Sequence, residues 1–107
     1  MKLNSDEIIL RKSRANHLKL FEGVGGRLFL TNQRLFFKSH FFNVQTHEET
    51  IPLQDIVSIE AKGSDFISGK MKIFLRNGSV EKFYVPKRKR WVSDIEKAIE
   101  EGKAKKT

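Results

Sequence analysis

The sequence predicts a mainly β domain of the α+β class, a barrel of about seven antiparallel strands capped by one C-terminal helix. Two patterns lead to this prediction. Short apolar runs with period-2 alternation recur up to Val85 and are separated by turn residues, as is typical of barrels and sandwiches. After Pro86 the apolar residues recur with the period of an α-helix, which indicates one amphipathic helix. The 107 residues fit one domain.

Two strand-like segments open the chain, Glu7 to Arg11 and Asn16 to Phe21, with a basic run between them. The alternative for the first segment is a single helical turn. The glycine-rich segment Glu22 to Gly26 then predicts a loop between the first two barrel strands. Because this segment leads into a strand and does not open a helix, it lacks the context of a phosphate-binding loop. Two apolar runs follow within Gly26 to Ser39, and Asn32 between them accepts the left-handed backbone of a tight hairpin turn.

The second half of the chain contains the clearest strand signals. Glu49 to Leu53 is a short strand in which Pro52 must lie at an edge or a bulge, since proline donates no ladder hydrogen bond. Ile56 to Glu60 is the next strand. Lys70 to Arg76 alternates apolar and basic residues, as expected of an antiparallel strand with one wet face. Asn77-Gly78 then predicts a type I′ turn into a return strand.

One apolar stripe predicts the helix, and it is formed by Trp91, Ile95, Ala98 and Ile99. Gly102 follows at a position where helices commonly stop. We therefore assign residues 1–102 to a single domain and residues 103–107 to a basic, frayed tail.

Two stretches closely resemble the GRAM domain: Gly26 to Ser39, which reads GRLFLTNQRLFFKS, and Ile51 to Glu60, which reads IPLQDIVSIE. The family pattern is a Gly-x-Leu-aromatic-Leu-Thr-Asn-x-Arg-Leu hairpin followed by an Ile-Pro-Leu-x-Asp-Ile run, and both occur here in that order. The resemblance covers Asp6 to Glu60. It implies a PH-like fold and a binding module found in membrane-associated proteins, with phosphoinositides or proteins as ligands in some members.

The sequence departs from one pattern of the wider PH superfamily. PH domains that hold phosphoinositides usually carry a Lys and an Arg-x-Arg pair in the loop that joins the first two barrel strands. The segment Glu22 to Gly26 contains an acid and no base at that place. The resemblance therefore does not extend to a headgroup-specific phosphoinositide site.

The charge of the chain favours an anionic partner. The formal net charge is +8, and such an excess attracts nucleic acid and anionic lipid headgroups alike. A surface charge of this size is also normal for a soluble domain, which is the alternative interpretation. Two basic segments supply the candidate ligand-binding residues, which are Arg11, Lys12 and Arg14 near the N-terminus and Lys87, Arg88, Lys89 and Arg90 before the helix.

The second of these basic segments is the denser one. Four successive bases at the start of a helix oppose the helix dipole, which favours an anion nearby. The alternative is that the segment is a solvated turn.

Two pairs of adjacent apolar residues lie in predicted loops, Phe41 with Phe42 and Phe66 with Ile67. Neighbouring strand residues face opposite sides of a sheet, so both members of a pair cannot point inward. Exposed pairs would contact a membrane interface, a protein partner or a second copy of the chain. In the alternative arrangement, each loop folds over and packs both side chains against the barrel.

No catalytic or metal-binding set is found in the sequence. The histidines are His17, His40 and His47, and cysteine is absent, so no nucleophile with its base and orienting group can be nominated. We therefore predict a protein that is not an enzyme and uses no cofactor or metal. Nucleic acid is a disfavoured partner, because no RNP-type or helix-turn-helix pattern presents stacking platforms to bases.

The N-terminus has no signal-peptide pattern, and no segment approaches the roughly 20 apolar residues of a membrane-spanning helix. We therefore expect a cytoplasmic protein that contacts membranes only peripherally. The predicted function is a PH-like binding module for an anionic membrane surface or a protein partner. The alternative is a protein-interaction or oligomerisation domain, homo-oligomers included, with no lipid role.

Overall fold

The computed structural model describes residues 1–19, 22–39, 48–63 and 69–105. Its elements follow one another in this order: β1 Ile9–Lys19, β2 Glu22–Thr31, β3 Arg34–Ser39, β4 Glu48–Pro52, a 3-10 turn η1 Leu53–Asp55, β5 Ile56–Lys62, β6 Lys70–Leu75, β7 Val80–Tyr84 and α1 Arg88–Lys105.

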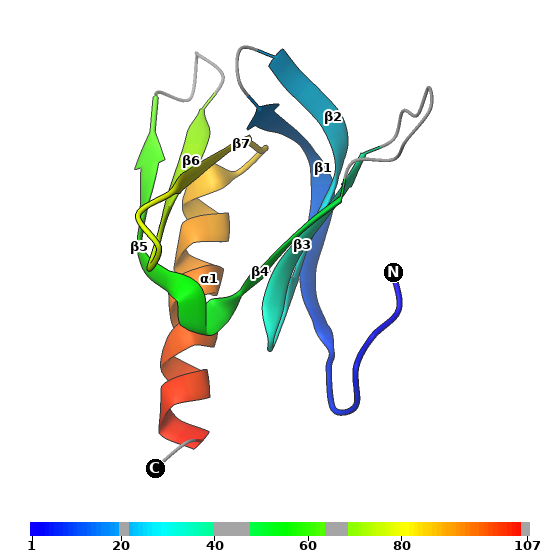
Figure 1. Ribbon diagram of the computed structural model, residues 1–107, viewed down its shortest axis with the longest axis vertical. Helices are drawn as coiled ribbons and strands as arrows, with labels where there is room; N and C mark the ends of the chain where they lie inside the picture. Colours follow the sequence, from blue (N-terminus) through cyan, green and yellow to red (C-terminus); the bar gives the residue numbers. More distant parts are fainter. Residues whose placement is uncertain (20–21, 40–47, 64–68, 106–107) are drawn as a thin grey trace.

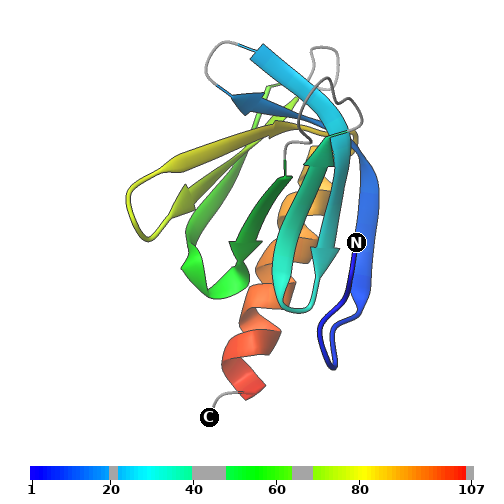
Figure 2. The ribbon, with the colours of Figure 1, turned by 45° about the vertical axis from the view of Figure 1, so that its right-hand side comes forward.

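All seven strands form one antiparallel sheet in the order β4-β3-β2-β1-β7-β6-β5. The sheet folds back on itself, so that β1 to β4 face β5 to β7, and α1 lies against the opening between the two halves (Figure 1). The last turns of α1 extend beyond the strands (Figure 2). The two sheet edges, β4 and β5, are joined through η1. These features confirm the predicted fold, a seven-stranded PH-like sheet with one C-terminal helix.

The core lies between the two halves of the sheet and the apolar stripe of α1. Side chains alternate inward along each strand, and α1 contributes Trp91, Ile95 and Ala98. Burial of such side chains removes apolar area from water and is the main stabilising contribution to the fold. The largest fully buried side chains are Trp91, Phe37, Phe83, Leu28, Leu30, Leu35, Met71, Ile73 and Ile95.

The sequence led us to expect the N-terminal basic run between two strands. The run lies instead inside a single strand. β1 is a single strand of 11 residues. Arg11 and Ala15 lie on the face toward the core, whereas Lys12 and Arg14 are exposed on the outer face. The alternation of a strand thus divides the basic run between its two sides.

The glycine-rich segment from Glu22 is also strand and not loop, because β2 begins at Glu22 and pairs with β1 as far as Lys19. At Gly26 a side chain would not fit: a Cβ would lie 2.8 Å from the Cα of Ser39 and would overlap the carbonyl oxygen of Lys38. Gly26 therefore permits β2 and β3 to approach each other closely.

The turns mostly follow the prediction. Pro52 ends β4 at a sheet edge, as its missing donor requires. The predicted type I′ turn at Asn77-Gly78 is wrong in type, since Gly78 has a positive φ of 92° and Asn77 does not. Leu75 accepts a hydrogen bond from the Gly78 amide and donates one to Ser79, so the hairpin uses a three-residue connection with glycine in the left-handed position.

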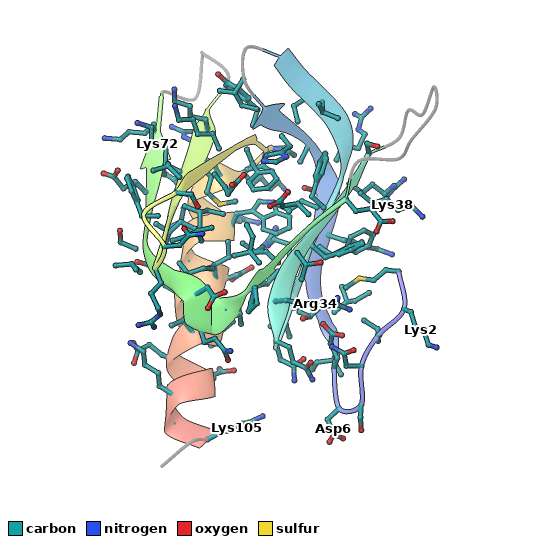
Figure 3. All side chains as sticks on the ribbon, viewed as in Figure 1. Lys2, Asp6, Arg34, Lys38, Lys72 and Lys105 are labelled. Carbon is teal, nitrogen blue, oxygen red and sulfur yellow. The ribbon has the colours of Figure 1, made fainter. Side chains whose placement is uncertain are left out.

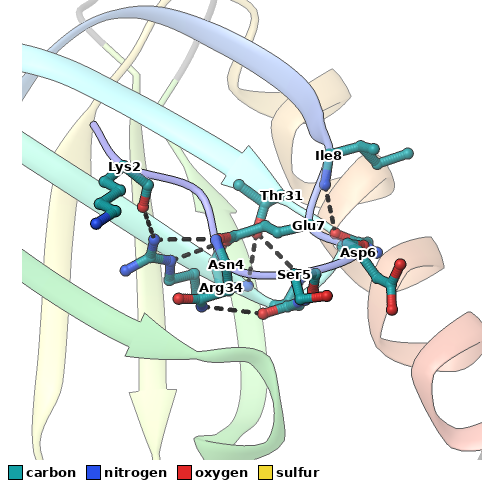
Figure 4. A network of polar contacts seen from close by, with 10 residues as sticks. Lys2, Asn4, Ser5, Asp6, Glu7, Ile8, Thr31 and Arg34 are labelled. Carbon is teal, nitrogen blue, oxygen red and sulfur yellow. Dashed lines mark hydrogen bonds and ion pairs between the residues drawn. The ribbon is translucent and has the colours of Figure 1, made fainter.

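A buried ion pair fixes the N-terminal segment to the turn between β2 and β3 (Figure 4). Arg34 donates from Nε to Glu7 Oε2 at 2.8 Å and from Nη2 to Glu7 Oε1 at 3.1 Å. Thr31 donates its hydroxyl to Glu7 Oε2 at 2.6 Å, and the Asn4 amide donates to Oε1 at 2.8 Å. The carboxylate of Glu7 is thus fully paired although it is buried.

These contacts shift the protonation of Glu7. Hydrogen bonds from Arg34, and then from Asn4 and Thr31, lower the pKa of Glu7 from 4.5 to about 2 against the opposing effect of burial. Because the folded-state pKa is lower than that of the unfolded chain, the pair stabilises the fold above pH 4.5. This contribution is lost as the pH falls toward about 2.

The variant Glu7→Gln tests this ion pair. At neutral pH we expect it to lower the free energy of unfolding by about 3 kcal/mol, because Arg34 keeps its charge without a counterion. The difference from the wild type should shrink as the pH falls from 4.5 toward 2. Urea denaturation followed by Trp91 fluorescence at a series of pH values measures both quantities. A difference that stays constant over this range would contradict the assignment.

The sequence led us to expect that the helix ends at Gly102. The helix continues instead to Lys105. Gly102 has no positive φ and has open space where a Cβ would be. Glycine within a helix is unfavourable but tolerated, and Lys103 and Lys105 in the last turn interact favourably with the helix dipole.

Replacement of Gly102 by alanine distinguishes a helical glycine from a helix stop. In a continuing helix, Gly102→Ala should raise the free energy of unfolding by up to about 1 kcal/mol. At a left-handed stop the same change would lower it. Gly26→Ala is the matched control and should destabilise the chain, because its Cβ would overlap the backbone of β3. Chemical denaturation of the three proteins provides the measurement.

Candidate functional site

Three cations lie side by side on the outer face of β1, β2 and β3. Arg14 is directly opposite Arg27, and Arg27 is directly opposite Lys38. All three side chains are exposed, and Lys12 is exposed two residues before Arg14 on the same face. We call these four residues the outer cation row. Figure 3 shows Lys38 directed away from the barrel, on the side of the sheet opposite to α1.

Among the described residues, no carboxylate forms an ion pair with the outer cation row. Glu48 of β4 is opposite Lys38, but none of the four cations forms an ion pair with a carboxylate of the described residues. Like charges directly opposite each other on neighbouring strands are destabilising. An anion bound across the row would remove this repulsion.

The outer face of β5 and β6 is basic too, but a carboxylate lies within it. Lys72 is opposite Glu60, and Lys62 Nζ lies 3.4 Å from Glu60 Oε2. Figure 3 shows Lys72 on the other side of the molecule from Lys38. Each face thus has a carboxylate opposite a lysine, Glu48 opposite Lys38 and Glu60 opposite Lys72, but of these two carboxylates only Glu60 forms an ion pair among the described residues.

Exposed apolar side chains adjoin the outer cation row. Leu10 lies at a register irregularity of β1, two residues before Lys12, and is 44% exposed, and Ile8 just before the strand is 58% exposed. Phe29, opposite Lys12, is half-buried. Its ring centroid lies 6.2 Å from that of Phe36. This face thus combines unpaired cations with large apolar side chains.

The predicted candidate Arg11 does not join this surface. Its side chain lies on the core side of β1, where Nε is 2.6 Å from Asp94 Oδ2. Its guanidinium also lies 5.8 Å from the centroid of the Trp91 ring. Arg11 therefore joins β1 to α1 by an ion pair and a cation–π contact.

The four bases before the helix are likewise divided between buried and exposed positions. Arg88 is buried, donates from Nη2 to the carbonyl oxygen of Gly63, and occupies the space beside Gly69. Lys87, Lys89 and Arg90 are exposed. Three cations of the run are therefore available to a partner, and Arg88 instead fixes the start of α1 to the segment that follows β5.

The structure separates these cations from those of β1. Lys12 and Arg14 belong to the outer cation row, whereas the exposed bases at the start of α1 lie beyond the end of β7. Sequence reasoning missed Arg27 and Lys38, which complete the row. The signal was their period-2 alternation with the buried residues Leu28 and Phe37, but the pairing that brings them opposite each other depends on strand register. Phe41, Phe42, Phe66 and Ile67 lie outside the described residues.

One histidine is buried within the barrel. His17 Nε2 lies 2.6 Å from Glu81 Oε1, and the ring stacks on Phe83 with a centroid distance of 4.6 Å. In the described part of the chain no three residues of the metal-ligating types lie close enough to hold an ion. Over the same residues, no helix is long and apolar enough to cross a membrane.

Comparisons with known proteins identify structures with a similar fold. No curated protein sequence matches the chain. Among solved structures, the Vps36 N-terminal PH domain aligns with a TM-score of 0.76 and 17% identity, covering 94% of this chain and 84% of that chain. The C-terminal domain of an unknown protein from Leishmania infantum aligns with a TM-score of 0.75 and 15% identity, covering 89% and 86%. The N-terminal PH domain of human ARAP2 has a TM-score of 0.68 and 13% identity, covering 86% and 80%.

At these identities the structural likeness establishes the fold alone, and the fold is that of PH domains. The family is given by the sequence. The family model of the GRAM domain matches residues 1–100, nearly the whole chain, and GRAM and PH-like domains typically act as non-catalytic binding modules. The chain belongs to the GRAM domain family.

Proposed function

We propose that this GRAM domain docks on anionic membrane surfaces through the outer cation row and is active at the cytoplasmic face of a membrane. The observation that carries the proposal is the row of three exposed cations, Arg14, Arg27 and Lys38, none of which forms an ion pair with a carboxylate of the described residues. A row of headgroup phosphates would supply the missing counterions. The strands hold these side chains on one face, so the phosphates do not have to order a loop.

The binding free energy expected from the outer cation row is consistent with peripheral membrane binding. Each Lys or Arg near an anionic leaflet contributes about 1 kcal/mol, so the four residues of the row would contribute about 4 kcal/mol. Leu10 and Ile8 would add the burial of apolar area at the acyl boundary. Binding should therefore be reversible and sensitive to salt.

The exposed bases at the start of α1 offer a second anionic contact. Lys87, Lys89 and Arg90 follow β7 and lie near one end of the barrel. We favour the outer cation row because its side chains lie opposite one another on neighbouring strands and face the same way. Successive residues of a helix point in different directions.

Two variants with equal charge change decide between these surfaces. Arg14→Gln/Arg27→Gln/Lys38→Gln should weaken binding to vesicles of phosphatidylcholine and phosphatidylserine on the order of 100-fold, from about 1 kcal/mol per cation. Lys87→Gln/Lys89→Gln/Arg90→Gln should change it little. The measurement is co-sedimentation at low and high salt, with phosphatidylcholine vesicles as the uncharged reference.

The first variant should remain folded, since removal of opposed like charges relieves repulsion on a sheet surface. Circular dichroism and thermal unfolding check this point. A larger loss in the helix-start variant would transfer the site to Lys87, Lys89 and Arg90. Failure of the wild type to sediment with anionic vesicles would overturn the lipid proposal in favour of the protein-interaction domain.

A further inference from the structure

A groove lies at the end of the molecule where the last turns of α1 extend beyond the sheet. Its volume is about 800 Å³, within the range of about 300 to 1,000 Å³ that is usual for ligand sites. An adjoining hollow of about 550 Å³ shares Asn32, Gln33, Ala98 and Gly102 with it. None of the outer cation row lines either space.

Part of the lining of the groove is apolar. It is formed by Pro52 and Leu53 at the end of β4 and in η1, by Val57 of β5, and by Ala98 and Ile99 of α1. Val57 is 65% exposed, which is more than any other large apolar side chain among the described residues. An apolar partner side chain that covered Val57 would remove this area from water.

The charged residues that line the larger groove are all basic: Arg34, Arg76 and Lys103. Arg34 is neutralised by Glu7. Arg76 donates from Nη2 to the carbonyl oxygen of Gln54 and forms no ion pair with a described carboxylate. Lys103 lies 3.9 Å from Glu100 on the exposed surface of α1, where such a pair contributes little. The rim therefore favours carboxylates in a ligand.

Both edges of the sheet reach the groove. Thr50 and Pro52 come from β4, and Ile56 and Val57 come from β5. These are the two strands that have a neighbour on one side only. Edge strands present backbone donors and acceptors that an extended chain can pair with. This feature favours a peptide over a lipid tail, which cannot form such bonds.

We infer that this groove binds a short peptide segment of a partner protein, in which bulky apolar side chains alternate with Asp or Glu. The apolar side chains contact Val57, Leu53 and Ile99, and the carboxylates contact Arg76 and Lys103. The site uses none of the residues proposed to bind the membrane, so the two proposals stand or fall separately.

The test uses the full chain, labelled with nitrogen-15, and a capped ten-residue peptide in which leucine alternates with glutamate. Amide shifts should change around Val57, Arg76 and Ile99. Shifts concentrated around Arg14, Arg27 and Lys38 would instead show simple charge attraction to the outer cation row and would overturn the inference. Two peptides serve as references, one with lysine for glutamate and one with serine for leucine, and neither should bind.

Variants then test the residues. Val57→Glu should weaken binding of the leucine–glutamate peptide about tenfold or more, which corresponds to about 1.4 kcal/mol. The matched control is Val80→Glu, the same exchange at a valine that is 40% exposed and outside the groove. Lys103→Glu, on the exposed surface of α1, gives a second variant that does not disturb the sheet.

Vesicle binding separates this site from the membrane site. Val57→Glu should still sediment with anionic vesicles if the chain is folded. Equal peptide affinity of wild type, Val57→Glu and Lys103→Glu would overturn the inference, and so would the absence of amide shifts at saturating peptide.

Discussion

The pleat of β1 is the constraint on which the rest of the molecule depends. β1 joins the first half of the sheet to the second, because it pairs with β2 along its length and with β7 at Asn16 to Leu18. Its alternation sends Arg11 and His17 inward, to Asp94 and Glu81, and leaves Lys12 and Arg14 outside. A shift of one residue in this register would bury two cations without partners. The same constraint thus fixes the packing of α1 and the position of the outer cation row.

Within the stretches that carry the family resemblance, Thr31, Asn32 and Arg34 stabilise the fold through contacts with the N-terminal segment. Thr31 and Arg34 bind the carboxylate of Glu7, while Asn32 accepts a hydrogen bond from the Ile8 amide and donates to the carbonyl oxygen of Asp6. Gln33 accepts at its carbonyl oxygen from the Leu53 amide, which ties the hairpin to the start of η1. The Leu-Thr-Asn-x-Arg-Leu signature therefore identifies the domain through contacts that stabilise its fold, and Asn32, Gln33 and Arg34 of this signature also line the groove.

The difference between local sequence patterns and contacts of distant residues explains how much of the structure the sequence could predict. The β2–β3 hairpin, the edge position of Pro52 and the helix stripe depend on local pattern, and they were predicted. The site depends on contacts between distant residues. The opposition of Arg27 to Arg14 and Lys38 follows from strand register, and the burial of Arg88 follows from its packing on Gly63 and Gly69. A basic run in a sequence does not reveal which of its members faces solvent, and Arg11 and Arg88 both bind other parts of the chain.

We place the membrane-binding face on the outer side of β1 to β3, away from the start of α1. Paramagnetic relaxation in the presence of anionic bicelles with spin-labelled headgroups tests this claim most directly. We expect the strongest loss of amide signal at Leu10, Arg14, Arg27 and Lys38, with little loss at Lys87, Lys89 and Arg90. The strongest loss at the start of α1, with the amides of β1 to β3 unaffected, would contradict it.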